Sequence, residues 1–170
     1  MSYVYFRLPH STHIFRNRLT TEPEEIASLA ELNGRRGFVI APFAPSESCP
    51  ILLMPTDWEE VELCSKKTDS CSDQAMLNAD SNVSAMLIDA DYEEERERYA
   101  VDFHNYHGQL SAGAFQKIVL VRSARLTATE QISPLTLFAR ACRRYPRMFV
   151  TLFSTERSGT WIIATPETLI

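Results

Sequence analysis

One apolar stretch, residues 115–121, constrains the fold of this chain more than any other segment because a lysine lies inside it. Side chains of a strand alternate between two faces, so Lys117 would share a face with Val119, while Ile118 and Leu120 would lie on the other. The stretch therefore predicts a strand that is buried on both sides. A lysine in such a strand is costly unless it is paired or neutral.

The residues alone leave two interpretations of this lysine open. A lysine near the edge of a sheet can extend its ammonium group to water along its apolar stem. Alternatively, desolvation lowers the pKa of a buried amine by up to roughly 3–5 units, which makes a lysine a base near neutral pH. Taken by itself, the stretch favours the first interpretation.

Composition and charge exclude some classes of protein. The chain has 170 residues, of which 45% are hydrophobic and 23% are charged, as in an ordinary soluble globular protein. We expect a single domain, residues 1–170, that stands alone or forms part of a larger protein. The formal net charge of −5 argues against a dedicated nucleic-acid binder.

The sequence also indicates a compartment. The N-terminal residues lack the charged and apolar regions of a signal peptide, and no apolar run is long enough to span a membrane. The four cysteines form no CxxC pair and have no spacing typical of metal ligands. We therefore expect reduced, structural thiols in a cytoplasmic protein without a membrane partner.

The order of predicted elements indicates the fold class. Capping signals and apolar periodicity predict helices over residues 20–34, 92–110 and 133–145. Apolar runs predict strands over residues 37–43, 51–54, 85–88, 115–121, 148–153 and 161–164, and residues 59–83 form a probable polar loop. Together these elements predict an α+β fold, with a largely antiparallel sheet and two to three packing helices.

Two predicted helices carry an apolar face that we expect to be buried. In residues 92–110 the face consists of Tyr99, Phe103, Tyr106 and Leu110, and in residues 133–145 it consists of Leu135, Phe138 and Cys142.

Several polar residues could form a site, and each has an ordinary structural explanation. His104 and His107 are three apart on a predicted helix, but no third metal ligand is in register with them, so structural histidines are favoured. Glu167 follows a strand and a proline, where it is either a surface residue or a carboxylate held at the end of the sheet. A basic helical face suits the helix dipole or would bind an anion, and it consists of Arg140, Arg143, Arg144 and Arg147.

Two segments carry a resemblance to a known family. The segment SAGAFQKIVLVR, residues 111–122, is similar to an AG-type turn followed by a KVVLxR strand, and WIIATPETLI, residues 161–170, is similar to a GASPExLL segment. Ile163 stands where that segment usually has glycine. Residues 111–170 thus resemble the chorismate-binding enzymes, and within them isochorismate synthase. Upstream, GFVIAPF at residues 37–43 is similar to a stretch common in the menaquinone-pathway type of this family.

The resemblance implies roles for two residues. Lys117 matches the general base that deprotonates the water attacking C2 of chorismate, and Glu167 matches the general acid that protonates the departing C4 hydroxyl. A neutral amine and a neutral carboxylic acid suit acid–base chemistry near pH 7. Relatives that use ammonia carry glutamine at the lysine position, so the lysine indicates a water-using isochorismate synthase, with a salicylate synthase-type relative as the alternative.

The resemblance also implies a Mg²⁺ cofactor, whose glutamate ligands are expected downstream of residue 170, with no metal ligand within this chain. The chain is therefore expected to be an incomplete N-terminal fragment of an isochorismate synthase for menaquinone biosynthesis, inactive by itself. One alternative is a non-catalytic truncated product that self-associates through its cut edge. Another is an unrelated anion-binding module that uses the arginine face.

Overall fold

The computed structural model describes residues 1–55, 57–63, 87–89, 91–129 and 131–166. The chain divides into two compact units: the first comprises Met1–Ser81 and Ser133–Ile170, and the second comprises Asn82–Ile132. This division does not test the expected single domain, which stays a prediction.

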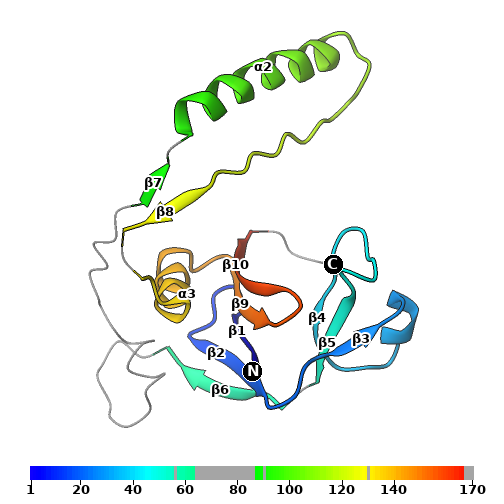
Figure 1. Ribbon diagram of the computed structural model, residues 1–170, viewed down its shortest axis with the longest axis vertical. Coiled ribbons are helices and arrows are strands. Elements are labelled where there is room, and N and C mark those ends of the chain that lie inside the picture. Colours follow the sequence, from blue (N-terminus) through cyan, green and yellow to red (C-terminus); the bar gives the residue numbers. More distant parts are fainter. Residues whose placement is uncertain (56, 64–86, 90, 130, 167–170) are drawn as a thin grey trace. The chain divides into compact units, whose positions relative to one another are not determined.

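The first unit is built on a five-stranded antiparallel sheet with the order β10-β9-β1-β2-β6 (Figure 1). The five strands are β1 (Ser2–Arg7), β2 (His13–Leu19), β6 (Glu59–Glu62), β9 (Phe149–Thr155) and β10 (Gly159–Thr165). Strand β1 lies in the centre, between β2 and β9. The sheet thus joins segments from the two ends of the sequence.

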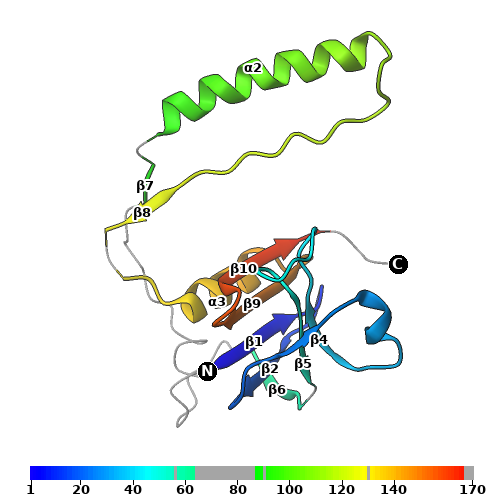
Figure 2. The same cartoon turned by 45° about the vertical axis from the view of Figure 1, so that its right-hand side comes forward.

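Helix α3 (Pro134–Arg144) covers one face of this sheet (Figure 2). Its Phe138 and Cys142 pack with Tyr5 of β1 and with Val150 and Leu152 of β9, and all five side chains are buried. Burial of this apolar face stabilises the helix against the sheet because the hydrophobic effect scales with the apolar area removed from water.

A small second sheet lies on the opposite face of the five-stranded sheet. It has the order β3-β5-β4, in which the strands are β3 (Glu24–Ile26), β5 (Ile51–Pro55) and β4 (Gly37–Ile40). Met54 of β5 packs against Val4 and Phe153 of the larger sheet. Gly37 is needed at the β4–β5 contact because a Cβ there would lie 2.5 Å from the carbonyl oxygen of Met54.

In the second unit, the residues that the structure describes form one helix and one strand pair. Helix α2 (Tyr92–Ser111) is followed by an extended segment, residues 114–125, that runs back beside the helix to β8 (Leu126–Ala128) (Figure 1). Strand β8 pairs antiparallel with β7 (Leu87–Asp89). None of the residues of α2 is buried.

The structure confirms the α+β class and several predicted elements. Helices α2 and α3 and strands β4, β5, β7, β9 and β10 lie where they were predicted, within a few residues at their ends. The buried face of α3 is also confirmed, with Leu135 partly buried beside the core. The apolar face predicted for α2 is wrong as a buried face, since Phe103 is 54% exposed.

The helix predicted over residues 20–34 is also wrong. That segment forms strand β3 and a short 3-10 helix η1 (Leu29–Leu32). Ile26 pairs with Ile51 and is buried beside it and Leu53, so contact with a strand distant in sequence overrides the local helix signals. The predicted loop over residues 59–83 is wrong where β6 forms, and residues 64–83 lie outside the described part of the chain.

Candidate functional site

Lys117 lies in the extended segment between α2 and β8, where the structure has no regular secondary structure. Its side chain is exposed, and its neighbours Val119 and Val121 are 71% and 81% exposed. The predicted strand, buried on both sides, is therefore wrong for this segment. Backbone pairing with another strand would turn an extended apolar segment into a buried strand, and residues 115–121 pair with no strand among the described residues.

The extended segment contacts α2 through Arg122, the last residue of the SAGAFQKIVLVR motif. The guanidinium of Arg122 lies 3.6 Å from the carboxylate of Glu95 and 5.4 Å from the ring centroid of Tyr92. Both residues belong to the first turns of α2. The extended segment that contains Lys117 is therefore held at one end by a charge pair and a cation–π contact.

Glu167 lies outside the described residues, so the structure does not give its position relative to Lys117. The described chain leads toward it through β10, which ends at Thr165 opposite Phe149 of β9. The roles of Lys117 as base and Glu167 as acid are untested by this geometry and stay predictions.

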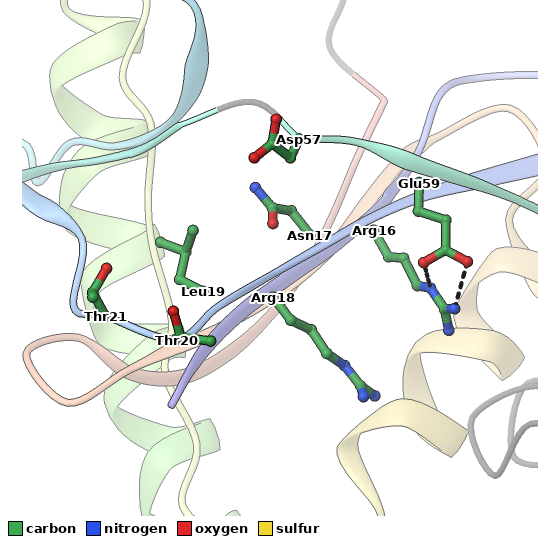
Figure 3. A pocket seen from close by; sticks show the side chains of 8 residues that line it. All are labelled: Arg16, Asn17, Arg18, Leu19, Thr20, Thr21, Asp57 and Glu59. Atoms are coloured by element: carbon green, nitrogen blue, oxygen red, sulfur yellow. Dashed lines mark hydrogen bonds and ion pairs between the residues drawn. The ribbon is translucent and has the colours of Figure 1, made fainter.

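A pocket of about 420 Å³ lies elsewhere, at the end of β2 (Figure 3). Arg16 faces Glu59 across it and donates two hydrogen bonds to its carboxylate, at 2.9 and 2.7 Å (Figure 3). Arg18 donates to the hydroxyl of Tyr5, at 2.8 and 3.1 Å, and Asn17 donates to a backbone carbonyl at 2.6 Å. The lining residues are Arg16, Asn17, Arg18, Leu19, Thr20, Thr21, Asp57 and Glu59.

This pocket does not contain the predicted acid–base pair. Arg16 and Glu59 are joined to each other, an arrangement that stabilises the β2–β6 edge rather than supplying a reactive base. Sequence reasoning did not single out these residues. Two arginines spaced i, i+2 on a strand were the available signal, because this spacing places Arg16 and Arg18 on one face.

The other candidate groups of the sequence, two histidines and four arginines, are exposed. His104 and His107 are exposed on α2, and no group of three or more metal-ligating side chains occurs among the residues that the structure describes. The four arginines of the basic face are exposed, which fits a solvated face and an anion-binding patch equally, and the last of them, Arg147, lies beyond the end of α3 at Arg144. Cys49 and Cys142 are free thiols. In the described part of the chain, no helix is long and apolar enough to cross a membrane.

The fold and the motifs together define an α+β protein whose candidate base, Lys117, lies in an exposed extended segment and not in a sheet. Comparison with protein families gives the more specific result: the family model described as chorismate binding enzyme matches residues 51–170. The chain therefore belongs to the chorismate-binding enzyme family, and its function is a chorismate-using one. Neither the curated proteins nor the solved structures gave a match.

Proposed function

We propose that this chain is part of an isochorismate synthase, which converts chorismate to isochorismate. The single observation that carries the proposal is Lys117, which stands inside a KIVLVR segment of a chain whose match to the chorismate-binding family spans residues 51–170. Ammonia-using members of that family are expected to have glutamine at this position. A water-using enzyme is therefore the best fit.

In the proposed reaction Lys117, as the neutral amine, takes a proton from a water molecule. The water oxygen then bonds to C2 of chorismate, and the ring double bond shifts. Glu167, as the neutral acid, gives its proton to the C4 hydroxyl, which leaves as water. One water enters and one leaves, so the substrate and product are isomers, and the two side chains exchange protonation states during the step.

Mg²⁺ remains part of the proposal through the family resemblance alone. The described residues do not fit it, since they contain no group of three or more ligating side chains. Every step above is therefore assigned to this chain's own residues. A cytoplasmic location and a role in menaquinone biosynthesis are likewise proposals. Within the family, a salicylate synthase-type activity is the alternative.

The test is an assay of isochorismate formation by the complete enzyme, including any sequence that follows residue 170 in its reading frame. We expect Lys117→Ala and Glu167→Gln each to lower kcat by a factor on the order of 10²–10⁴, the usual contribution of a positioned acid or base. The matched controls are Lys66→Ala and Glu156→Gln, which remove the same groups elsewhere and are expected to keep wild-type rates. Near-normal isochorismate formation by either site variant would contradict the role of that residue.

A second candidate is a non-catalytic product that self-associates, and exposed apolar side chains favour it. The apolar face of α2 is exposed along the helix: Tyr99, Phe103 and Tyr106 are 38%, 54% and 44% exposed. A contiguous exposed apolar patch favours association in water. Sedimentation of the 170-residue chain over a range of concentrations separates the two candidates, because a monomer at all concentrations would exclude the second one.

A further inference from the structure

Arg7, at the end of β1, is a buried arginine that binds four backbone carbonyls. Its side chain is 1% exposed and lies on the α3 side of the sheet, like that of Tyr5 two residues earlier. One terminal nitrogen donates to the carbonyl oxygens of Leu8 and Pro146, at 3.0 and 2.9 Å. The other donates to those of Tyr145 and Met148, at 2.7 and 2.8 Å.

These contacts require an arginine. A planar guanidinium presents several donors in a fixed fork, whereas a lysine ammonium is a compact charge that cannot reach the same set of oxygens. No ion pair with a carboxylate is found for Arg7 among the described residues. Its charge is instead balanced by the carbonyl oxygens after the C-terminus of α3, where the helix dipole is negative.

Three of the four bound carbonyls, those of Tyr145, Pro146 and Met148, lie just before a ladder of paired residues. Met148 precedes Phe149, the first residue of β9, and Phe149 pairs with Thr165, the last residue of β10. Val150 pairs with Arg7 on one side and with Ala164 on the other. Arg7 therefore contacts the start of β9 through both its backbone and its side chain, and β9 sets the register of the end of β10.

We propose that Arg7 is a positioning residue for the proposed reaction, because it fixes the end of β10 from which the chain continues to Glu167. This inference rests on the proposed function. Glu167 follows Thr165 by two residues, so an error in the register or angle of β10 would displace the acid. Small displacements of a reacting group cost rate even when the fold is kept.

The test compares Arg7→Lys with Arg16→Lys, measured at a temperature where both variants are folded. Arg16 is a matched control because it also makes a two-bond contact, with Glu59, but on the β2–β6 side of the sheet, away from β10. We expect Arg7→Lys to lower kcat of the complete enzyme on the order of 10–100-fold with KM changed by less than about twofold. We expect Arg16→Lys to keep kcat.

Amide hydrogen exchange of the 170-residue chain gives a second readout, independent of activity. The amides of β10 are expected to exchange faster in Arg7→Lys and unchanged in Arg16→Lys. If Arg7→Lys fails to fold, Arg7→Gln, which keeps two donors without the charge, takes its place.

The outcomes separate the two proposals. Unchanged kcat and unchanged β10 exchange in a folded Arg7 variant would overturn the positioning role, while the proposed function would stand. A wild-type enzyme that forms no isochorismate would remove the proposed function and the catalytic part of the inference. Exchange alone would then decide whether Arg7 holds β10.

Discussion

Cys142 is a buried thiol on the face of α3 that packs against the sheet, and burial raises its pKa to about 11. The nearby guanidinium of Arg7 acts in the opposite direction and is the smaller effect. Burial disfavours the thiolate because the apolar surroundings cannot solvate its charge. The thiol is therefore an inert core group at neutral pH, in agreement with the structural role expected from the sequence.

The raised pKa of Cys142 predicts a pH dependence of stability. In the unfolded chain the thiol loses its proton near its ordinary pKa of 9.0, whereas the folded chain keeps the proton up to about pH 11. The folded state thus binds more protons across this window, and the free energy of unfolding must fall as pH rises through it. We expect the stability advantage of the wild type over Cys142→Ala to shrink between about pH 8 and about pH 10.5 in urea titrations.

Cys49 provides the control for this experiment, because it is an exposed free thiol. The difference in free energy of unfolding between the wild type and Cys49→Ala should stay constant over the same range. A constant difference for Cys142→Ala as well would contradict the burial effect.

Lys117 and Arg7 show what residue-level reasoning could and could not predict. The chemistry of Lys117 came from its place in a recognisable segment, but its environment was wrong because the sequence does not say whether an apolar segment finds a strand to pair with. Arg7 was not predicted at all. Three of its four partners, the carbonyls of residues 145, 146 and 148, lie 138–141 residues away in the sequence, and contacts across such a separation leave no local pattern.

Helices α2 and α3 were both predicted from apolar periodicity, yet they differ in what their apolar side chains contact. Phe138 of α3 is fully buried against the sheet, whereas Phe103 of α2 is 54% exposed and stacks on Tyr99 and His107 of its own helix. Periodicity shows that a helix has an apolar face. It does not show that another element covers that face.

This difference predicts opposite results for the same substitution. Phe138→Ala should lower the free energy of unfolding of the first unit by about 3–5 kcal/mol, because it leaves a cavity in the core. Phe103→Ala should change that free energy by less than about 0.5 kcal/mol, as for a surface substitution. The two tryptophans, Trp58 and Trp161, both lie in the first unit, so their fluorescence reports its unfolding in denaturant. Equal losses in the two variants would contradict the assignment of the core.

At the scale of the whole molecule, the first unit is assembled from both ends of the chain. Its central strand pairs, β1 with β9 and β9 with β10, and its α3 core all lie within residues 1–81 and 133–170. The described part of the second unit, residues 87–89, 91–129 and 131–132, contributes no strand to the two larger sheets.

Replacing residues 82–132 with a Gly/Ser linker of about 15 residues should therefore leave the first unit folded. The loop-closure term even favours the shorter connection slightly, because its entropic cost falls with loop length. We expect a cooperative thermal transition, followed by tryptophan fluorescence, with a midpoint within about 5 °C of the wild-type value. Loss of cooperative unfolding would show that residues 82–132 supply part of the core.

The sequence by itself determined the elements whose signals are local: the capped helix α3, the β9–β10 hairpin and the α+β class. Its motifs also carried the membership in the chorismate-binding family, which the family match confirms over residues 51–170. Only the tertiary structure decided that residues 24–26 form a strand, that Lys117 is exposed and that Arg7 donates hydrogen bonds to backbone carbonyls just before β9. The physical reason is that capping and periodicity act between near neighbours, whereas strand pairing and burial depend on partners far away in the chain.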